Sequence, residues 1–107
     1  MRGGVAGFDW DTGNWPKCGK HGVSKAEIEH VLRSGSFVLP DRHPQDRETR
    51  FDAVGKNEAG RYVFVVFAVR ERAGERLLRP ISARYMHRKE IENYERQQEA
   101  FSALRDG

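Results

Sequence analysis

The sequence is poor in cysteine and has no long apolar run. Its 107 residues include one cysteine, Cys18, so no intramolecular disulfide can form, and the disulfide framework of small secreted proteins is excluded. No apolar run approaches the roughly 20 residues of a membrane-spanning helix, and the N-terminus lacks the apolar segment of a signal peptide. We therefore expect a cytoplasmic protein that makes no membrane contact.

The usual motifs of metal and cofactor binding are missing as well. The histidines form no HxxxH or HExxH pair, and no second cysteine can complete a metal site. The phosphate-binding patterns GxxxxGKS/T and GxGxxG are absent, as is the GxSxG of serine hydrolases. The sequence thus predicts neither a metal nor a cofactor. Cys18 could be a nucleophile beside His21, but a small packing side chain is the favoured interpretation.

The composition of the sequence favours a single small domain that spans residues 1–107. Hydrophobic residues make up 37% and charged residues 33% of the chain, which is apolar enough to pack a core. The formal net charge is +3 and the isoelectric point is about 9.3. This basic balance is compatible with a nucleic acid or another polyanion as partner, and also with a basic surface that binds nothing.

Apolar periodicity predicts an α+β fold. After a flexible lead-in over residues 1–7, alternation indicates a short half-buried strand at Phe8–Asp11. Tyr62–Val69 is apolar at both odd and even positions, so both of its faces should be covered, and it should be the central strand of a β-meander. The other strands are expected at Phe37–Leu39, at Arg50–Gly55 after a polar loop over residues 41–48, and at Leu77–Tyr85. Pro80 suggests an edge or a bulge. We expect a sheet of about four antiparallel strands with helices on one face.

Local signals predict three helices. A short one should begin with Asn14 as its N-cap and end near Gly22, which can adopt a left-handed conformation. The next begins with the capping box Ser24-Lys25-Ala26-Glu27 and ends at Ser34. The chain should be helical again from His87 onward.

Cations gather around these elements and could bind phosphates. They are Lys17, Lys20 and His21 before the capped helix, Arg70, Arg72, Arg76 and Arg79 around one hairpin turn, and Arg84 and His87 at the last junction. RNA cleavage without a metal needs such a set. A base takes the 2′-hydroxyl proton, the oxygen attacks phosphorus, cations stabilise the phosphoryl charge and an acid protonates the leaving 5′-oxygen. Histidine suits the proton transfers, and arginine suits the phosphate.

Plainer interpretations apply to each of these residues. The arginines can be solvated, Lys17 and Lys20 can complement the negative end of a helix, and His21 can be a turn residue. From residue types and spacing alone, a non-catalytic binding module is favoured over a ribonuclease.

Four separated motifs change this balance. FDWDTGNWPKCGKHGVSKAEIEHVL is followed in order by DRHPQDRETRFDAVG, GRYVFVVFAVR and RPISARYMHRKEIENYE. Together they resemble the BrnT family of bacterial toxins, whose members open with an F-D/E-W-D strand followed by K/R-H-G and a helix rich in glutamate. The resemblance covers Phe8 to about Glu95. It implies a RelE-like ribonuclease fold and a type II toxin that blocks translation by cutting RNA without a metal.

The resemblance also implies partners and site residues. The partners are an RNA substrate, an antitoxin encoded beside the toxin, and operator DNA bound only through the antitoxin complex. The catalytic residues carried over by motif are Lys20, His21, Arg70 and Arg84. Further cations expected to bind RNA are Lys17, Arg50, Arg79 and His87. The alternative function is a non-catalytic nucleic-acid-binding module that acts with a partner in transcriptional repression.

Two features depart from the family pattern. Gly19 falls inside the short helix, where glycine lowers helix stability. Residues 97–107 form a helical extension past the usual end of the family, for which dimerisation and antitoxin docking are both open.

The position of Arg70 relative to Arg84 depends on one turn. A three-residue loop after Arg72 puts both arginines on the same sheet face, about 20 Å apart at the usual strand rise, so that one phosphate could not contact both. A loop of even length predicts opposite faces instead. The sequence leaves this register open.

Overall fold

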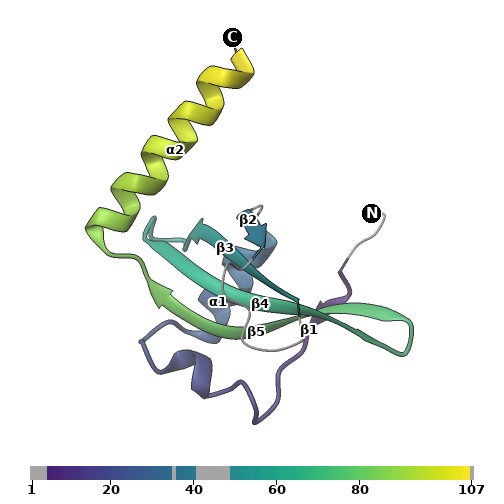
Figure 1. Ribbon diagram of the computed structural model, residues 1–107. Coiled ribbons are helices and arrows are strands. Elements are labelled where there is room, and N and C mark those ends of the chain that lie inside the picture. The colour runs from purple at the N-terminus through teal and green to yellow at the C-terminus, as the bar shows by residue number, and fades with distance from the viewer. Residues whose placement is uncertain (1–4, 35, 41–48, 107) are drawn as a thin grey trace.

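The part of the chain that the structure describes folds into a five-stranded mixed sheet with two α-helices (Figure 1). The structure is a computed structural model and describes residues 5–34, 36–40 and 49–106. The strand order is β1-β5-β4-β3-β2. The strands are β1 (Gly7–Phe8), β2 (Phe37–Pro40), β3 (Arg50–Lys56), β4 (Tyr62–Arg72) and β5 (Glu75–Tyr85). The helices are the 3-10 helix η1 (Lys17–Gly19), α1 (Lys25–Arg33) and α2 (Arg88–Asp106). The predicted α+β class is confirmed.

The fifth strand corrects the prediction of four antiparallel strands. β1 pairs in parallel with β5, opposite Leu77 and Leu78, whereas the other three pairings are antiparallel. The strand expected at Phe8–Asp11 is shorter and begins one residue earlier, inside the expected lead-in. After Phe8, the side chains of Asp9 and Asp11 form ion pairs with Arg72 of β4 and Arg79 of β5. Residues 1–4 of the lead-in and the polar loop at 41–48 lie outside the described residues.

A two-residue turn joins β4 to β5. Ala73 and Gly74 occupy it with φ of 52° and 80°, the left-handed conformation that tight hairpins require. Arg70 therefore lies opposite Leu77, and not opposite position 78 as a three-residue loop would give. A register shift between Val66 and Phe67, beside Pro80, then adds one residue to β5. This bulge confirms one of the two roles expected for Pro80.

The capping box of α1 forms as predicted. Ser24 Oγ accepts a hydrogen bond from the Glu27 N–H at 3.1 Å, and the Glu27 carboxylate accepts one from the Ser24 N–H at 2.9 Å. Ile28 and Val31 on the buried face of α1 are fully inaccessible to solvent. They belong to one core with side chains from the sheet and the N-terminal segment, namely Cys18, Val23, Ala53, Val63, Val65, Phe67 and Ala83. Cys18 is thus a packing residue, and burial raises the pKa of its thiol.

Glu27 also ties α1 to the sheet. Its Oε2 accepts hydrogen bonds from Asn57 Nδ2 at 2.8 Å and from Tyr85 Oη at 2.7 Å. Partial burial works against the charged form, but these bonds and those from Ser24 outweigh it and lower the pKa of Glu27 to about 2. The carboxylate therefore stays ionised throughout the physiological range.

The second α-helix extends away from the sheet, as Figure 1 shows. Tyr94 of α2 contacts Phe37 and Tyr62, with ring centroids 6.0 and 5.6 Å apart. By register, Phe37 and Tyr62 project from the face opposite to Ala53, which packs on α1. The expectation that the helices pack on one face is therefore wrong. Within the described residues, no helix is long and apolar enough to cross a membrane.

Candidate functional site

A cavity of about 170 Å³ is lined by four cations. Arg50 of β3 and Arg79 of β5 both lie opposite Ala68 of β4, and Arg70 lies two residues further along β4 on the same face. Lys17 reaches the cavity from η1, and the remaining lining comes from Gly13, Asn14 and Ile81. The register of three neighbouring strands therefore brings together cations that are far apart in sequence.

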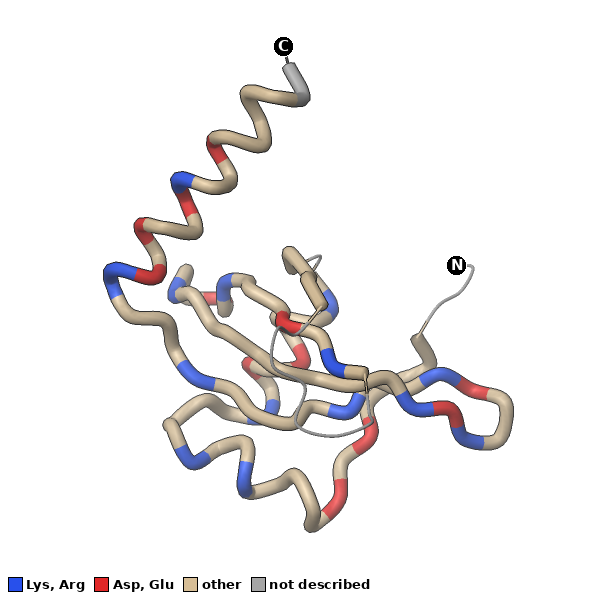
Figure 2. The backbone as a smooth tube through the Cα atoms, in the orientation of Figure 1, with Lys and Arg blue, Asp and Glu red and all other residues tan. Residues whose placement is uncertain are grey.

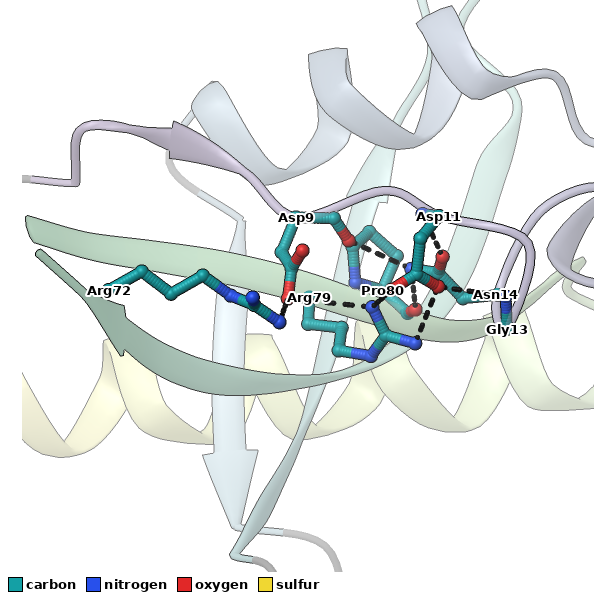
Figure 3. Close-up of polar contacts among 7 residues, drawn as sticks. All are labelled: Asp9, Asp11, Gly13, Asn14, Arg72, Arg79 and Pro80. Carbon is teal, nitrogen blue, oxygen red and sulfur yellow. Dashed lines mark hydrogen bonds and ion pairs between the residues drawn. The ribbon is translucent and has the colours of Figure 1, made fainter.

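Arg79 is held by two carboxylates of the segment after β1 (Figure 3). Its Nη1 and Nη2 donate to the two Asp11 oxygens at 3.1 and 3.0 Å, and Nη1 lies 3.4 Å from Asp9 Oδ2. Arg72 Nη2 donates to the same Asp9 oxygen at 3.2 Å. The Arg79 side chain is 14% exposed and that of Asp9 is 10% exposed. The hydrogen bonds from Arg79, together with the Gly13 N–H, lower the pKa of the Asp11 carboxyl.

Asn14 completes this clamp. Its buried side-chain amide donates to the backbone carbonyls of Asp9 and Pro80, both at 2.9 Å, and its Oδ1 accepts from the Asp11 N–H at 2.8 Å. The predicted capping role of Asn14 is wrong, because Pro16 occupies the N-cap of η1 and the amide is used to cross-link the segment to β5. The clamp fixes the chain three residues before Lys17 and so places Lys17 at the cavity.

The bend after η1 presents Lys20 and His21. Both side chains are exposed, and Gly22 has a φ of 92°, as expected for a left-handed reversal. Gly19 has a steric explanation: a Cβ atom at this position would lie 2.8 Å from the Trp15 ring. The absence of a side chain at Gly19, which departs from the family pattern, therefore leaves room for the Trp15 ring against the backbone. At a 3-10 rise of about 2 Å per residue, Lys20 begins about 6 Å beyond Lys17 along the chain.

Arg84 and His87 lie apart from the cavity, at the junction of β5 and α2. Arg84 donates two hydrogen bonds to Glu90, at 2.8 and 2.7 Å, and its guanidinium lies 4.8 Å from the Phe64 ring centroid. This ion pair raises the pKa of Arg84 and lowers that of Glu90 to about 2. Glu90 also accepts from the His87 N–H at 2.8 Å. Arg84 therefore anchors the first turn of α2.

Arg70 and Arg84 lie on the same face of the sheet in spite of the two-residue turn. Arg84 pairs with Phe64, which is six residues from Arg70 on β4, and the bulge in β5 compensates for the shorter loop. Six residues correspond to about 20 Å of strand. The eight predicted site residues thus form three groups: Lys17, Arg50, Arg70 and Arg79 around the cavity, Lys20 and His21 on the bend, and Arg84 and His87 at the junction.

The cavity suits one anionic group. Its volume is below the roughly 300–1,000 Å³ of sites that enclose a drug-sized ligand. Arginine forks and an ammonium group match the oxygens of a phosphate. The described residues contain no group of three or more histidine, cysteine, aspartate or glutamate side chains placed to hold a metal ion.

Sequence reasoning missed the acidic half of this site. The alternation at Phe8–Asp11 explains Asp9 and Asp11 only as the polar positions of a strand. A usable signal was present, because two acidic residues near one end of the chain face an excess of arginines around one hairpin. Charge alone, however, does not say which arginine each would meet.

The fold and the cationic cavity define a small α+β protein with a cavity whose charge and size suit one phosphate group. Residues 10–90 match the family described as ribonuclease toxin, BrnT, of type II toxin-antitoxin system. This match covers more than half of the chain, and the protein belongs to the BrnT family. The resemblance inferred from four motifs is therefore confirmed, and membership implies an antitoxin partner and an RNA target. The comparison with curated proteins gives no match.

Proposed function

We propose that this chain is the toxin of a type II toxin-antitoxin pair and an endoribonuclease that cleaves RNA without a metal ion. The observation that carries the proposal is the cavity lined by Lys17, Arg50, Arg70 and Arg79 in a member of a ribonuclease family. A phosphodiester of RNA is the anion that such a protein must bind. Cations fixed on three strands and a clamped turn are preorganised for it, which is the main requirement for stabilising charge in a transition state.

The reaction is a transfer within the RNA. The ribose 2′-oxygen attacks the adjacent phosphorus, its proton passes to a base, the bond from phosphorus to the 5′-oxygen breaks, and that oxygen takes a proton from an acid. The products are a 2′,3′-cyclic phosphate and a 5′-hydroxyl end. We assign charge stabilisation to Arg70, with Lys17 and Arg50 as further phosphate contacts. Lys20 and His21 are assigned to proton transfer because they are exposed on the bend that continues from Lys17.

Arg79 and Arg84 receive other roles. The guanidinium of Arg79 is engaged by Asp9 and Asp11, so Arg79 acts mainly as a positioning residue that holds the turn with Lys17. Arg84 is bound to Glu90 and lies about 20 Å along β4 from Arg70. One phosphate cannot contact both arginines. Arg84 and His87 would therefore contact a different phosphate of the same RNA strand, or Arg84 would act only to anchor α2.

The alternative is a non-catalytic nucleic-acid-binding module that represses transcription with its partner. In either case operator DNA would be reached through the antitoxin complex. The cationic cavity alone fits both functions, since phosphate contacts position any nucleic acid. Membership in a ribonuclease family favours cleavage.

One experiment separates the two functions. Toxin freed of antitoxin is incubated with a defined RNA in the presence of a chelator, and the ends of the products are analysed. We expect fragments with 2′,3′-cyclic phosphate, and a rate loss on the order of 10² to 10³ for Arg70→Ala, as for removal of one transition-state donor. Arg76→Ala, on the exposed arm of the same hairpin, is the matched control and should cleave normally. RNA that is bound but left uncut by the wild type would favour the repressor module.

A further inference from the structure

A second concave region lies at the opposite end of β3 and β4 from the cationic cavity. It consists of two neighbouring hollows of about 620 and 800 Å³. Both are lined by His30 and Ser34 near the end of α1 and by Asn57 and Glu58 in the turn between β3 and β4. Because they share these four residues, the two hollows adjoin each other, and together they are called the α1–turn groove.

One end of the groove is acidic. Glu27 and Glu29 of α1 line it together with Glu58 of the turn. The Glu27 carboxylate remains ionised because it accepts hydrogen bonds from the Ser24 N–H, Asn57 Nδ2 and Tyr85 Oη. Arg33 lies 3.7 Å from Glu29 and offsets part of this charge. The result is a local excess of carboxylates in a chain whose net charge is +3.

The other end of the groove is aromatic. Phe37, Tyr62 and Tyr94 line it, at the point where α2 meets the sheet. Gln98 of α2 lines the same end, and its side-chain nitrogen is buried without a hydrogen-bond acceptor among the described residues. A buried donor without an acceptor is energetically costly, and the backbone carbonyl of a bound peptide would supply one.

The groove is separate from the proposed catalytic site. Arg50 lines the cationic cavity and Lys56 lines the groove, and these residues are six positions apart on β3, or about 20 Å. None of the residues described around the cavity lines the groove. Binding in the groove therefore does not require any of the cations that line the cavity.

We propose that the α1–turn groove binds a segment of the antitoxin that carries a lysine or arginine next to a large apolar residue. The cation would meet Glu27, Glu29 and Glu58, and the apolar side chain would pack on the aromatic end. The carbonyl between them would accept from Gln98. The identity of the partner rests on the proposed function, whereas the chemistry of the segment follows from the groove.

Glu58→Lys is the test, because Glu58 is exposed at the tip of a turn and its replacement leaves the core intact. The matched control is Glu75→Lys, also exposed, at the hairpin end of β5 and with the same change in charge. The full-length variants are titrated with the purified protein encoded next to the toxin gene. We expect Glu58→Lys to weaken binding on the order of 10-fold. Glu75→Lys should bind as the wild type does, and both variants should cleave RNA normally.

A charge exchange then identifies the segment. Changing its lysine or arginine to glutamate should restore affinity for Glu58→Lys toxin and lower affinity for the wild type, as a double-mutant cycle requires. Equal affinity of Glu58→Lys, Glu75→Lys and wild-type toxin would overturn the proposal. So would dimerisation of the toxin alone that Glu58→Lys abolishes, since a second copy would then occupy the groove. A wild type that binds the antitoxin in this way but cuts no RNA would leave the groove assignment standing and refute only the ribonuclease.

Discussion

Arg79 and Asp11 form a two-bond ion pair, with nitrogen–oxygen distances of 3.1 and 3.0 Å, although 68 positions separate them in the chain. With Asp9 and Asn14, this pair fastens the N-terminal segment across β5 next to its bulge (Figure 3). Lys17 follows that segment directly. The geometry of the cationic cavity thus depends on two acidic residues, Asp9 and Asp11, that do not themselves line it.

The first prediction concerns this clamp. Arg79→Met should lower the free energy of unfolding by about 3 kcal/mol, because it leaves the largely buried Asp9 carboxylate with less compensation. Arg72→Met is the matched control, since the Arg72 side chain is 56% exposed and an exposed pair contributes about 1 kcal/mol or less. Urea unfolding of the two variants measures the difference. Equal losses would show that the ion pairs of Arg79 contribute no more to stability than an exposed pair does.

Local parts of this fold could be predicted from the sequence. The capping box of α1 is one of them, because Ser24 and Glu27 are three residues apart. Each side chain accepts a hydrogen bond from the other's backbone N–H, wherever the helix packs. The turn between β3 and β4 also follows from residue types, whereas Pro80 indicates an edge or a bulge without deciding between them. The parallel pairing of β1 with β5 does not follow from residue types, because its partners are about 70 positions apart and two residues carry little pattern.

The candidate site was predictable only in its composition. Arg50, Arg70 and Arg79 converge because Arg50 and Arg79 both flank Ala68, and this register depends on turn lengths that the sequence left open. The bulge in β5 then returns Arg84 to the face of Arg70, which the two-residue turn alone would have prevented. Figure 2 shows the lysines and arginines scattered along the described part of the backbone, without a continuous cationic run.

The second prediction concerns Gly19. Gly19→Ala should lower the free energy of unfolding by about 1–3 kcal/mol, the usual range for an overpacked site, because its Cβ would lie 2.8 Å from the Trp15 ring. Gly7→Ala serves as control, since the nearest atom to that Cβ is 3.9 Å away, an ordinary contact. Denaturant midpoints report both changes. A stability of Gly19→Ala equal to that of Gly7→Ala would mean that Trp15 moves without cost.

The third prediction concerns acid unfolding. The pKa of Glu27 is about 2 in the folded protein and about 4.3 in an unfolded chain, so the unfolded state takes up a proton first as the pH falls. The stability that Glu27 contributes is complete above about pH 5 and is lost between about pH 5 and pH 2. Glu27→Gln should remove about one proton from the pH dependence of the unfolding free energy in that window, about 1.4 kcal/mol per pH unit.

The measurement is urea unfolding at a series of pH values between about 7 and 2.5, all at the same salt concentration. This pH range covers most of the expected titration of Glu27. Glu58→Gln is the control, because Glu58 is exposed and contributes none of the hydrogen bonds around Glu27. Its curve should parallel that of the wild type. A Glu27→Gln curve that also parallels the wild type would assign the acid sensitivity to other carboxylates, such as Glu90.

The last prediction compares His21 with Arg84, two of the four residues that the family resemblance places in one catalytic set. His21→Ala should lower the cleavage rate on the order of 10² to 10⁴, the range for loss of a general acid or base. Its unfolding midpoint should not change, because the side chain is exposed on the bend. Arg84→Lys should do the opposite. Lysine cannot supply the two parallel hydrogen bonds to Glu90, so the start of α2 should loosen and the midpoint should fall.

Cleavage rate per folded molecule and thermal unfolding are measured on the same two preparations. Arg84→Lys should retain the wild-type rate once the folded fraction is taken into account, because Arg84 lies about 20 Å along β4 from the cavity at Arg70. A large loss of rate in Arg84→Lys at unchanged stability would instead make Arg84 a catalytic residue and move the scissile phosphate toward the junction of β5 and α2. Wild-type rates in both variants would confine the chemistry to the cavity, with Lys17, Arg50 and Arg70 as the residues to replace next.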